Sequence, residues 1–269
     1  MPGPASTAEV GELSEEIRVV DIRDESLTGS MMIVGFPTHG LVGSVAASYL
    51  VHALDMTPVA YVASEGFPPT VIMEGGAVSS PVRMYASKLV CGVDRKCDQL
   101  VVAISDIQPP VDMLNGLGRS LLDWAERKGI QMVVAVEGQP VDEGTRGDAR
   151  VVAMANRPAV PVIEKLGFEP ANGVITGFAG GMLLSALGRH MPVLCLVAQA
   201  HKDFPDARAA AKVIESINPL VPMLALDTKP LREKARVLEA QMRKSLEEQK
   251  KSMSSMRQTE TEGPGEMYR

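Results

Sequence analysis

The sequence predicts an α/β layered fold with a mainly parallel central sheet. Short continuous apolar runs, such as SMMIVGF at residues 30–36, are typical of strands that are buried on both faces. Between these runs lie segments with helical spacing of apolar residues, such as 111–129, which predict amphipathic helices. Because strands and helices alternate along the chain, we expect βαβ units with helices on the faces of one sheet.

The first βαβ unit is predicted near the N-terminus. A short strand candidate at residues 17–22 follows the polar segment 1–15, which is predicted to be disordered. The buried strand 30–36 runs into the turn PTHG and then into a helix over 41–54, whose apolar residues recur at helical spacing. Strand 58–63 completes the unit, so we expect it to run parallel to strand 30–36.

The remaining elements continue this alternation. The further strand candidates are residues 70–73, 77–87, 98–106, 130–138, 149–158 and 192–200. The further helix candidates are residues 111–129, 159–167, 177–191 and 206–218. Gly75 and Gly76 predict the turn of a hairpin. Gly129 and Gly167 predict helix C-caps, and Asp206 predicts an N-cap.

The composition changes at Thr228, which divides the chain. Residues 16–227 form the predicted α/β domain, and residues 228–258 predict one long basic amphipathic helix. This helix segment contains nine basic and four acidic residues, so it carries a formal charge of +5. Because the whole chain carries −6, the remaining residues together carry −11. Residues 259–269 are typical of a flexible tail.

Composition and charge exclude several classes of function. The net charge of −6 argues against nucleic acid as the main partner, because a phosphate backbone requires a basic surface. The longest apolar runs are far shorter than the roughly 20 residues of a membrane span, and the N-terminus lacks the features of a secretory signal. Cys91, Cys97 and Cys195 are an odd number and match no zinc spacing, and we expect Cys195 to be buried. We therefore expect a cytoplasmic protein in a reducing compartment, with no metal and no cofactor.

The turn GFPTHGLVGS at residues 35–44 is the first candidate site. Its candidate ligand-binding or family-signature residues are Gly35, Phe36, Pro37, His39, Gly40 and Gly43. A glycine-rich turn before a helix can bind an anion at the helix N-terminus, or it can allow close packing of the backbone. The turn has neither the Lys of a P-loop nor a Gly-x-Gly-x-x-Gly pattern, which favours close packing. We expect His39 to face solvent, and a role as a general base is the alternative.

The carboxyl ends of the predicted strands form a second candidate region. Parallel sheets bind their ligands at this edge. The loops that share it follow Gly35, Asp106, Glu137 and Gln199. Asp106 and Glu137 lie where catalytic carboxylates often occur, but they can equally cap helices. No Ser-His-Asp arrangement suggests itself and no Gly-x-Ser-x-Gly elbow occurs, so we predict no catalytic residue.

The last residues of the sequence, Met267, Tyr268 and Arg269, form a third candidate site. They follow a segment of Glu, Gly and Pro that has nothing to bury. A terminal carboxylate offers one fixed charge, and an adjacent tyrosine offers a rigid ring with a polar tip. This combination suits a peptide anchor for a pocket on a partner, and a linker before it lets several tails reach separate pockets.

Four segments together resemble the proteasome assembly chaperone family in its archaeal form. They are MMIVGFPTHGLVGSVAASYLV, YVASEGFPPTVIMEGG, QLVVAISDIQPP and VVAVEG. The resemblance covers about residues 17 to 220. It implies a three-layer α/β/α sandwich related in shape to nucleoside phosphorylases, without a demonstrated enzymatic role. It also implies a homo-oligomer that binds the core proteasome or the precursors of its α-subunits.

The resemblance also implies a role for the end of the chain. Members of this group can carry a C-terminal hydrophobic-Tyr-any (HbYX) motif, and Met267, Tyr268 and Arg269 match its three positions. The terminal carboxylate is then expected to pair with a lysine in a pocket between α-subunits. The predicted function is an ATP-independent assembly chaperone or proteasome-binding factor. The alternatives are a nucleoside-phosphorylase-like or ligase-like enzyme that uses the glycine-rich turns, and a plain oligomeric scaffold.

Overall fold

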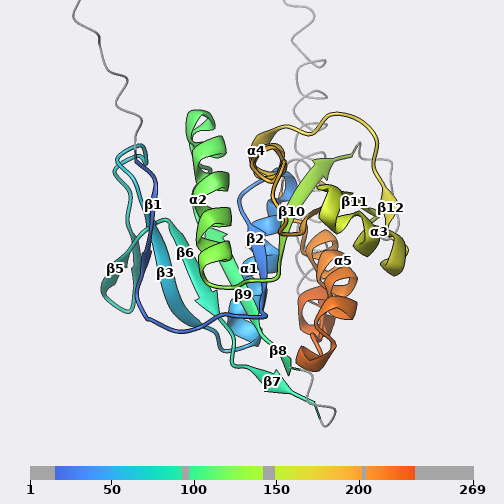
Figure 1. Cartoon of the computed structure of the whole chain (residues 1–269), viewed down its shortest axis with the longest axis horizontal. Coiled ribbons are helices and arrows are strands. Elements are labelled where there is room, and N and C mark those ends of the chain that lie inside the picture. The colour runs from blue at the N-terminus through green and yellow to red at the C-terminus, as the bar shows by residue number, and fades with distance from the viewer. Residues whose placement is uncertain (1–15, 93–96, 142–148, 202–203, 234–269) are drawn as a thin grey trace, which may run out of the picture.

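The structure is a computed structural model that describes residues 16–92, 97–141, 149–201 and 204–233. In this part of the chain, nine strands form one sheet (Figure 1). In their order across the sheet, they are β1 (Arg18–Asp21), β3 (Thr57–Ala63), β6 (Val82–Ala86), β9 (Leu100–Ser105), β2 (Met31–Gly35), β10 (Met132–Pro140), β13 (Val193–Ala200), β11 (Val151–Ala155) and β12 (Glu169–Pro170). Two small hairpins lie outside this sheet, namely β4 (Ile72–Glu74) with β5 (Ala77–Ser79) and β7 (Val90–Cys91) with β8 (Cys97–Asp98).

Helices connect β2 to β3, β9 to β10, β11 to β12 and β12 to β13. The α-helices are α1 (Val42–Ala53), α2 (Leu114–Arg127), α3 (Val160–Leu166), α4 (Gly177–Ser185) and α5 (Ala207–Ile217). Short 3₁₀ helices are η1 (His39–Leu41), η2 (Val111–Met113), η3 (Arg157–Ala159), η4 (Asn218–Leu220) and η5 (Pro222–Leu224). The hairpin predicted at Gly75 and Gly76 is the β4–β5 pair.

The four central strands, β9, β2, β10 and β13, run parallel to one another. The flanks are mainly antiparallel: β1, β3 and β6 form an antiparallel ladder that joins β9, and β11 runs antiparallel to β13, while the edge strand β12 pairs parallel with β11. The prediction of a mainly parallel central sheet is therefore confirmed for the centre. The antiparallel flanks were not predicted, because apolar periodicity does not reveal the direction in which a strand pairs.

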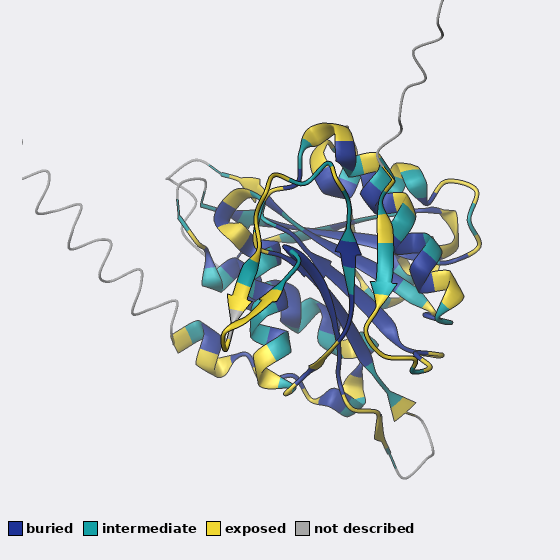
Figure 2. Ribbon diagram, turned by 90° about the vertical axis from the view of Figure 1, so that its left-hand side faces the viewer, coloured by how far each residue is buried: buried dark blue, intermediate teal, exposed yellow. Residues whose placement is uncertain are grey.

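The central strands are buried on both faces, as their apolar runs predict (Figure 2). Side chains alternate between two core clusters, so that Met31 and Ile33 of β2 join one cluster, and Met32 and Val34 join the other. Helices α1 and α5 contribute to the first cluster, while α2 and α4 contribute to the second. Helices therefore cover both faces of the sheet, which is a three-layer α/β/α arrangement (Figure 1).

Helix α2 fixes the N-terminal strand β1 to the sheet. Its Trp124 is fully buried, and the indole Nε1 donates a hydrogen bond of 2.8 Å to Oδ1 of Asp21 in β1. The Ser120 hydroxyl donates to the Ile17 carbonyl at 3.0 Å, and Lys128 forms an ion pair with Asp21 at 3.1 Å. The ring of Trp124 thus packs in the core, while its N–H reaches a polar partner.

The predicted helix caps are confirmed by the backbone geometry. The carboxylate of Asp206 accepts a hydrogen bond of 2.9 Å from the Ala209 N–H and caps α5. Gly129 and Gly167 follow α2 and α3 with positive φ angles of 75° and 65°. Glycine adopts this left-handed conformation without steric cost, which ends each helix.

Several predictions fall at or beyond the ends of the described chain. Residues 229–233 are helical, and the rest of the long helix predicted over 228–258 lies outside the described residues. So do the segment 1–15 and the tail 259–269, which contains the predicted anchor. Within the described part of the chain, each helix is too short or too polar to cross a membrane.

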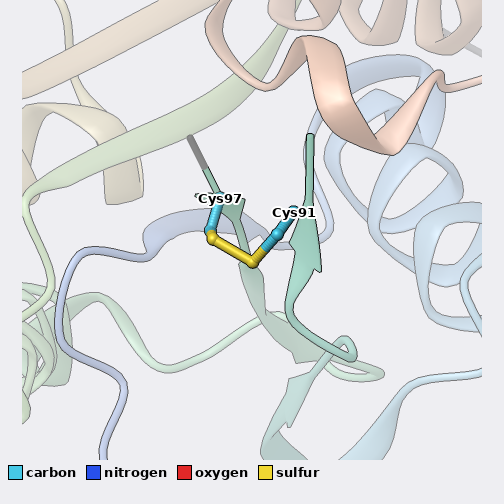
Figure 3. The surroundings of a disulfide bond; sticks show 2 residues. All are labelled: Cys91 and Cys97. Carbon is cyan, nitrogen blue, oxygen red and sulfur yellow. A yellow bond between two sulfur atoms is a disulfide. The ribbon is translucent and has the colours of Figure 1, made fainter. Parts of the chain in front are cut away.

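Cys91 and Cys97 form a disulfide between β7 and β8 (Figure 3). The same hairpin is tied to η5, because the Met223 N–H donates a hydrogen bond of 2.8 Å to Asp98. Cys195 is a buried thiol, as predicted. The disulfide, by contrast, differs from the expectation of a reducing compartment. The odd number of cysteines did not reveal the pair, which forms because a hairpin brings its two strands together.

We predict that the Cys91→Ser, Cys97→Ser double variant has a free energy of unfolding about 2 kcal/mol below that of the parent protein without reductant. The disulfide joins residues separated by 6 positions. Closing a loop of this size removes conformational entropy from the unfolded chain, which stabilises the folded state. Urea denaturation with and without dithiothreitol measures the effect, and equal stabilities of the oxidised parent and the double variant would contradict it.

Candidate functional site

The backbones of β2 and α1 touch at two glycines. A Cβ atom on Gly35 would lie 2.2 Å from the Gly43 carbonyl oxygen, and one on Gly43 would lie 2.7 Å from the Phe36 carbonyl oxygen. Side-chain carbons do not approach carbonyl oxygens so closely, so only glycine permits this contact. The turn from strand to helix is therefore held by direct backbone packing.

The same turn packs against the ends of β10 and β13. A Cβ atom on Gly138 would lie 1.9 Å from the His39 carbonyl oxygen, and the Gly138 N–H donates a hydrogen bond of 3.0 Å to the Thr38 hydroxyl. Gly40 has a φ angle of 61°, and its carbonyl accepts a hydrogen bond of 2.7 Å from the Asp206 N–H. Contacts from Gly138 in β10, from Ala200 at the end of β13 and from the N-cap of α5 thus fix the turn in place.

Close backbone packing accounts for the glycine pattern of the first candidate site. Its buried members are Gly35, Phe36, Gly40 and Gly43. Pro37 is half-buried, and His39 is exposed to solvent, as expected for a turn residue. Anion binding at this turn stays a prediction, since the packing explains the glycines without it.

A cavity of about 570 Å³ opens beside the turn, at the carboxyl ends of β2, β9 and β10. Its volume is in the range of small-molecule sites. The segment 171–177, which leads from β12 into α4, forms another part of its wall. The apolar lining includes Phe36, Leu41, Pro109, Met154, Ile175 and Phe178. The polar and titratable side chains that line it are Thr38, His39, Gln108, Glu137, Gln139, Asn172 and Thr176.

Glu137 is the acidic side chain of this cavity. Burial raises the pKa of its carboxyl from 4.5 to about 7, although hydrogen bonds from the Ala179 N–H and the Thr38 hydroxyl oppose this shift. The Ala179 N–H belongs to the first turn of α4, so the carboxyl also interacts with a helix N-terminus. The Oε2 atom of Glu137 is buried and has no hydrogen-bond partner in the described part of the protein. A buried acceptor without a donor is costly, which makes this atom a candidate contact for a ligand.

Two aromatic rings and a thiol complete the surroundings of Glu137. The rings of Phe36 and Phe178 have centroids 4.2 Å apart, and both residues line the cavity. Cys195 lies on the neighbouring strand β13, where burial and the charge of Glu137 raise the pKa of its thiol. A thiol held neutral in this way is a poor nucleophile, which assigns Cys195 to the core.

Asp106, the other carboxylate of the predicted rim, has a structural partner. Its Oδ2 atom lies 2.6 Å from Nη1 of Arg83, whose side chain is almost fully buried. The Arg83 Nε atom also donates a hydrogen bond of 2.8 Å to the Tyr85 hydroxyl. Asp106 lines a separate cavity of about 880 Å³ between α1 and residues 224–231. Because Asp106 and Glu137 line different cavities, the structure does not support an acid–base pair between them.

Sequence reasoning located this region but missed part of the cavity wall. The structure brings the predicted turn and the predicted rim together, because Phe36, His39 and Glu137 line one cavity. The residues that sequence reasoning missed are Thr38, Gln108 and Phe178. One signal was available, since a glycine directly after Glu137 marks a strand that another backbone approaches closely.

The chain is similar to known proteins over most of its length. The model of the PAC2 family matches residues 32–246, a range that includes the turn, the cavity and the central strands. The chain belongs to the PAC2 family. The resemblance to archaeal proteasome assembly chaperones is confirmed by this match and by the relatives with solved structures.

Two relatives of this PAC2 protein with solved structures share its fold over most of the chain, and a third relative is similar in sequence. PbaA of Pyrococcus furiosus, an archaeal homolog of proteasome-assembly chaperone, is 27% identical, with 91% of this chain and 98% of PbaA covered and a TM-score of 0.74. PbaB of the same organism, an archaeal proteasome activator, is 24% identical, with 86% and 98% covered and a TM-score of 0.71. The uncharacterized protein MJ0106 of Methanocaldococcus jannaschii is 25% identical over 228 residues, which are 84% of this chain and 90% of that protein.

We predict that Gly138→Ala lowers the free energy of unfolding by about 3 kcal/mol, because the new methyl group would overlap the His39 carbonyl oxygen. Gly116→Ala in α2 is the matched control, since its methyl group would meet only the flexible Ile17 side chain and alanine favours the helix. That control is expected to stay within about 1 kcal/mol of the parent. Thermal or urea unfolding of the two variants tests the difference, and equal effects would refute the role given to Gly138.

We predict that Glu137→Gln is more stable than the parent at about pH 8, by up to about 3 kcal/mol, and equally stable near pH 4.5. The carboxyl is protonated in both folded and unfolded states at low pH. Between about 4.5 and 7, the unfolded chain loses this proton first, so the parent loses stability as the pH rises. Glutamine has the same shape without the ionisation.

Urea denaturation across this pH range measures the prediction for Glu137. Glu164→Gln on the exposed surface of α3 is the control for loss of one negative charge, and its stability is expected to follow the parent at each pH. A constant difference between Glu137→Gln and the parent from pH 4.5 upwards would show that the folded protein does not hold the carboxyl in its protonated form.

Proposed function

We propose that this PAC2 protein is an ATP-independent proteasome assembly chaperone or proteasome-binding factor. The observation that carries this proposal is the similarity to PbaA, an archaeal homolog of proteasome-assembly chaperone, over 91% of this chain and 98% of that protein. At 27% identity the likeness extends from the fold to the sequence. Such a role requires differential binding of a partner and no bond chemistry.

The proposed contact is the tripeptide Met267, Tyr268 and Arg269, docked in pockets between α-subunits of the core proteasome. Met267 and the ring of Tyr268 supply apolar contact area, and the tyrosine hydroxyl supplies one polar contact. The terminal carboxylate supplies a fixed negative charge for a lysine in the pocket. Residues 259–266 consist of Thr, Glu, Gly and Pro, so the large apolar side chains of the tail are concentrated in the tripeptide.

We also propose that the protein acts as a homo-oligomer. A groove between α2 and α4 carries apolar side chains at its surface, and Val111, Leu184 and Leu187 are 81%, 58% and 68% exposed. Apolar side chains gathered in this way favour a protein contact. Several copies would present several tails, and simultaneous docking multiplies the affinity of each weak contact.

The enzyme alternative has less support than the chaperone. The glycines of the turn at 35–43 are explained by backbone packing, and the described lining of the adjacent cavity contains no Lys or Arg to bind a phosphate. Glu137 and Asp106 line different cavities. These observations favour binding functions over phosphoryl or glycosyl transfer.

We predict that removal of Met267 to Arg269 weakens binding to purified core proteasome about tenfold or more. The single variant Tyr268→Ala is expected to show most of this loss, because it deletes the aromatic anchor and keeps the carboxylate. Thr261→Ala, in the same segment but outside the tripeptide, is the control and is expected to bind like the parent. Biolayer interferometry on immobilised proteasome measures the four affinities, and circular dichroism confirms folding.

The outcomes separate the two parts of the proposal. If the truncated chain and Tyr268→Ala bind like the parent, the proteasome proposal stands and docking through the tail is wrong. If the parent itself does not bind the core proteasome or its isolated α-subunits, the proteasome proposal is wrong.

A further inference from the structure

We propose that the cavity beside Glu137 binds a small organic cation, an amine or guanidine carried on an apolar body. The site lies in the globular domain, at the carboxyl ends of β2, β9 and β10. It does not depend on the proposed tail docking and uses none of its residues. The features that support it are an unused acceptor, the charge of the wall and the aromatic lining.

The unused acceptor is the Oε2 atom of Glu137. This atom is buried and accepts no hydrogen bond from the described residues, while the Ala179 N–H and the Thr38 hydroxyl interact with the same carboxyl. Thr38 is itself held in place, because its hydroxyl accepts a hydrogen bond from the Gly138 N–H. The carboxyl is therefore oriented by its neighbours and retains one acceptor for a donor from outside the chain.

The charge of the wall selects a cation. The described residues that line the cavity include no Lys or Arg, so an anionic ligand would meet Glu137 without a compensating charge. Gln108, Gln139 and Asn172 supply neutral polar groups. A ligand with a positively charged N–H group would donate a hydrogen bond to the free carboxylate oxygen. Such a charge-assisted hydrogen bond is among the strongest polar contacts in a protein.

The rest of the wall suits an apolar body. The rings of Phe36 and Phe178 pack against each other in the cavity wall, and Met154 and Ile175 add further apolar surface. Aromatic rings attract cations through their faces and bury apolar groups at the same time. The volume of about 570 Å³ accommodates a drug-sized molecule.

Cation binding at this site should depend on pH. Burial raises the pKa of the Glu137 carboxyl to about 7, so a cation that requires the ionised form must displace its proton near neutral pH. Among the residues that the structure describes, the other titratable groups near it are His39 of η1, which is exposed and lines the same cavity, and the buried thiol of Cys195 in β13. Affinity should therefore rise about tenfold between about pH 6 and about pH 8, with release of protons on binding.

Isothermal titration calorimetry on the full chain tests the proposal with a matched set of probes. The cations are phenethylamine, benzamidine and agmatine, while 2-phenylethanol and phenylacetate share the apolar body but carry no charge or a negative charge. At least one cation is expected to bind at millimolar concentrations or below, and the alcohol and the acid are expected to bind at least about tenfold more weakly.

Variants locate the binding in the cavity. Glu137→Gln is expected to lower the affinity for the cation about tenfold or more, whereas Glu164→Gln on α3 is expected to leave it unchanged. His39→Gln removes the second titratable group of the wall, and the pH dependence is expected to persist in it. Titrations in buffers of different ionisation enthalpy measure the released proton in the parent protein, which needs no variant.

Three results would overturn the proposal. The first is that none of the cations binds at millimolar concentration. The second is that a cation binds Glu137→Gln as tightly as it binds the parent, which would place its contact elsewhere. The third is that the alcohol binds as tightly as the amine, which would show an apolar cavity without selection for charge.

Discussion

The contact of backbone with backbone at the β2–α1 turn is the constraint on which the rest of the structure depends. Gly35 and Gly43 let the strand and the helix touch, and Gly138 lets the turn approach the neighbouring strand β10. Because no side chain separates these segments, the turn and the end of β10 act as one rigid unit. This unit sets where α1 crosses the sheet and where the wall of the neighbouring cavity lies.

The same constraint decides the environment of Glu137. The strand that carries it continues through Gly138 beneath the turn, so the carboxyl points into a space bounded by the turn, the sheet and the first turn of α4. The carboxyl is largely removed from bulk solvent there, which is why burial dominates the pKa of this group over the hydrogen bonds that oppose it. A glutamate on an exposed helix face, such as Glu164, has no comparable environment.

The sequence contained enough to predict the layers and most element boundaries, because those depend on local patterns. Continuous apolar runs mark strands buried on both faces, and Gly167 and Asp206 mark helix ends. The antiparallel flanks, the Cys91–Cys97 pair and the cavity wall depend on contacts between segments far apart in the chain. Phe178, for example, follows Phe36 by more than half of the chain, yet their rings are in contact. No spacing rule connects such residues, so Glu137 was recognised as a rim carboxylate and its partners were not.

The second oxygen of Glu137 distinguishes a binding cavity from a gap in the packing. A structural role at the first turn of α4 requires one acceptor for the Ala179 N–H, and a neutral side chain such as Gln or Ser can supply it at no cost in ionisation. Glu137 instead carries a second acceptor that the described chain does not use, in a place where the ionised form is penalised by burial. A group that destabilises the free protein and gains its missing partner from a ligand is typical of a functional site. The tail docking and the cation site that we propose therefore rely on separate residues and on separate chemistry.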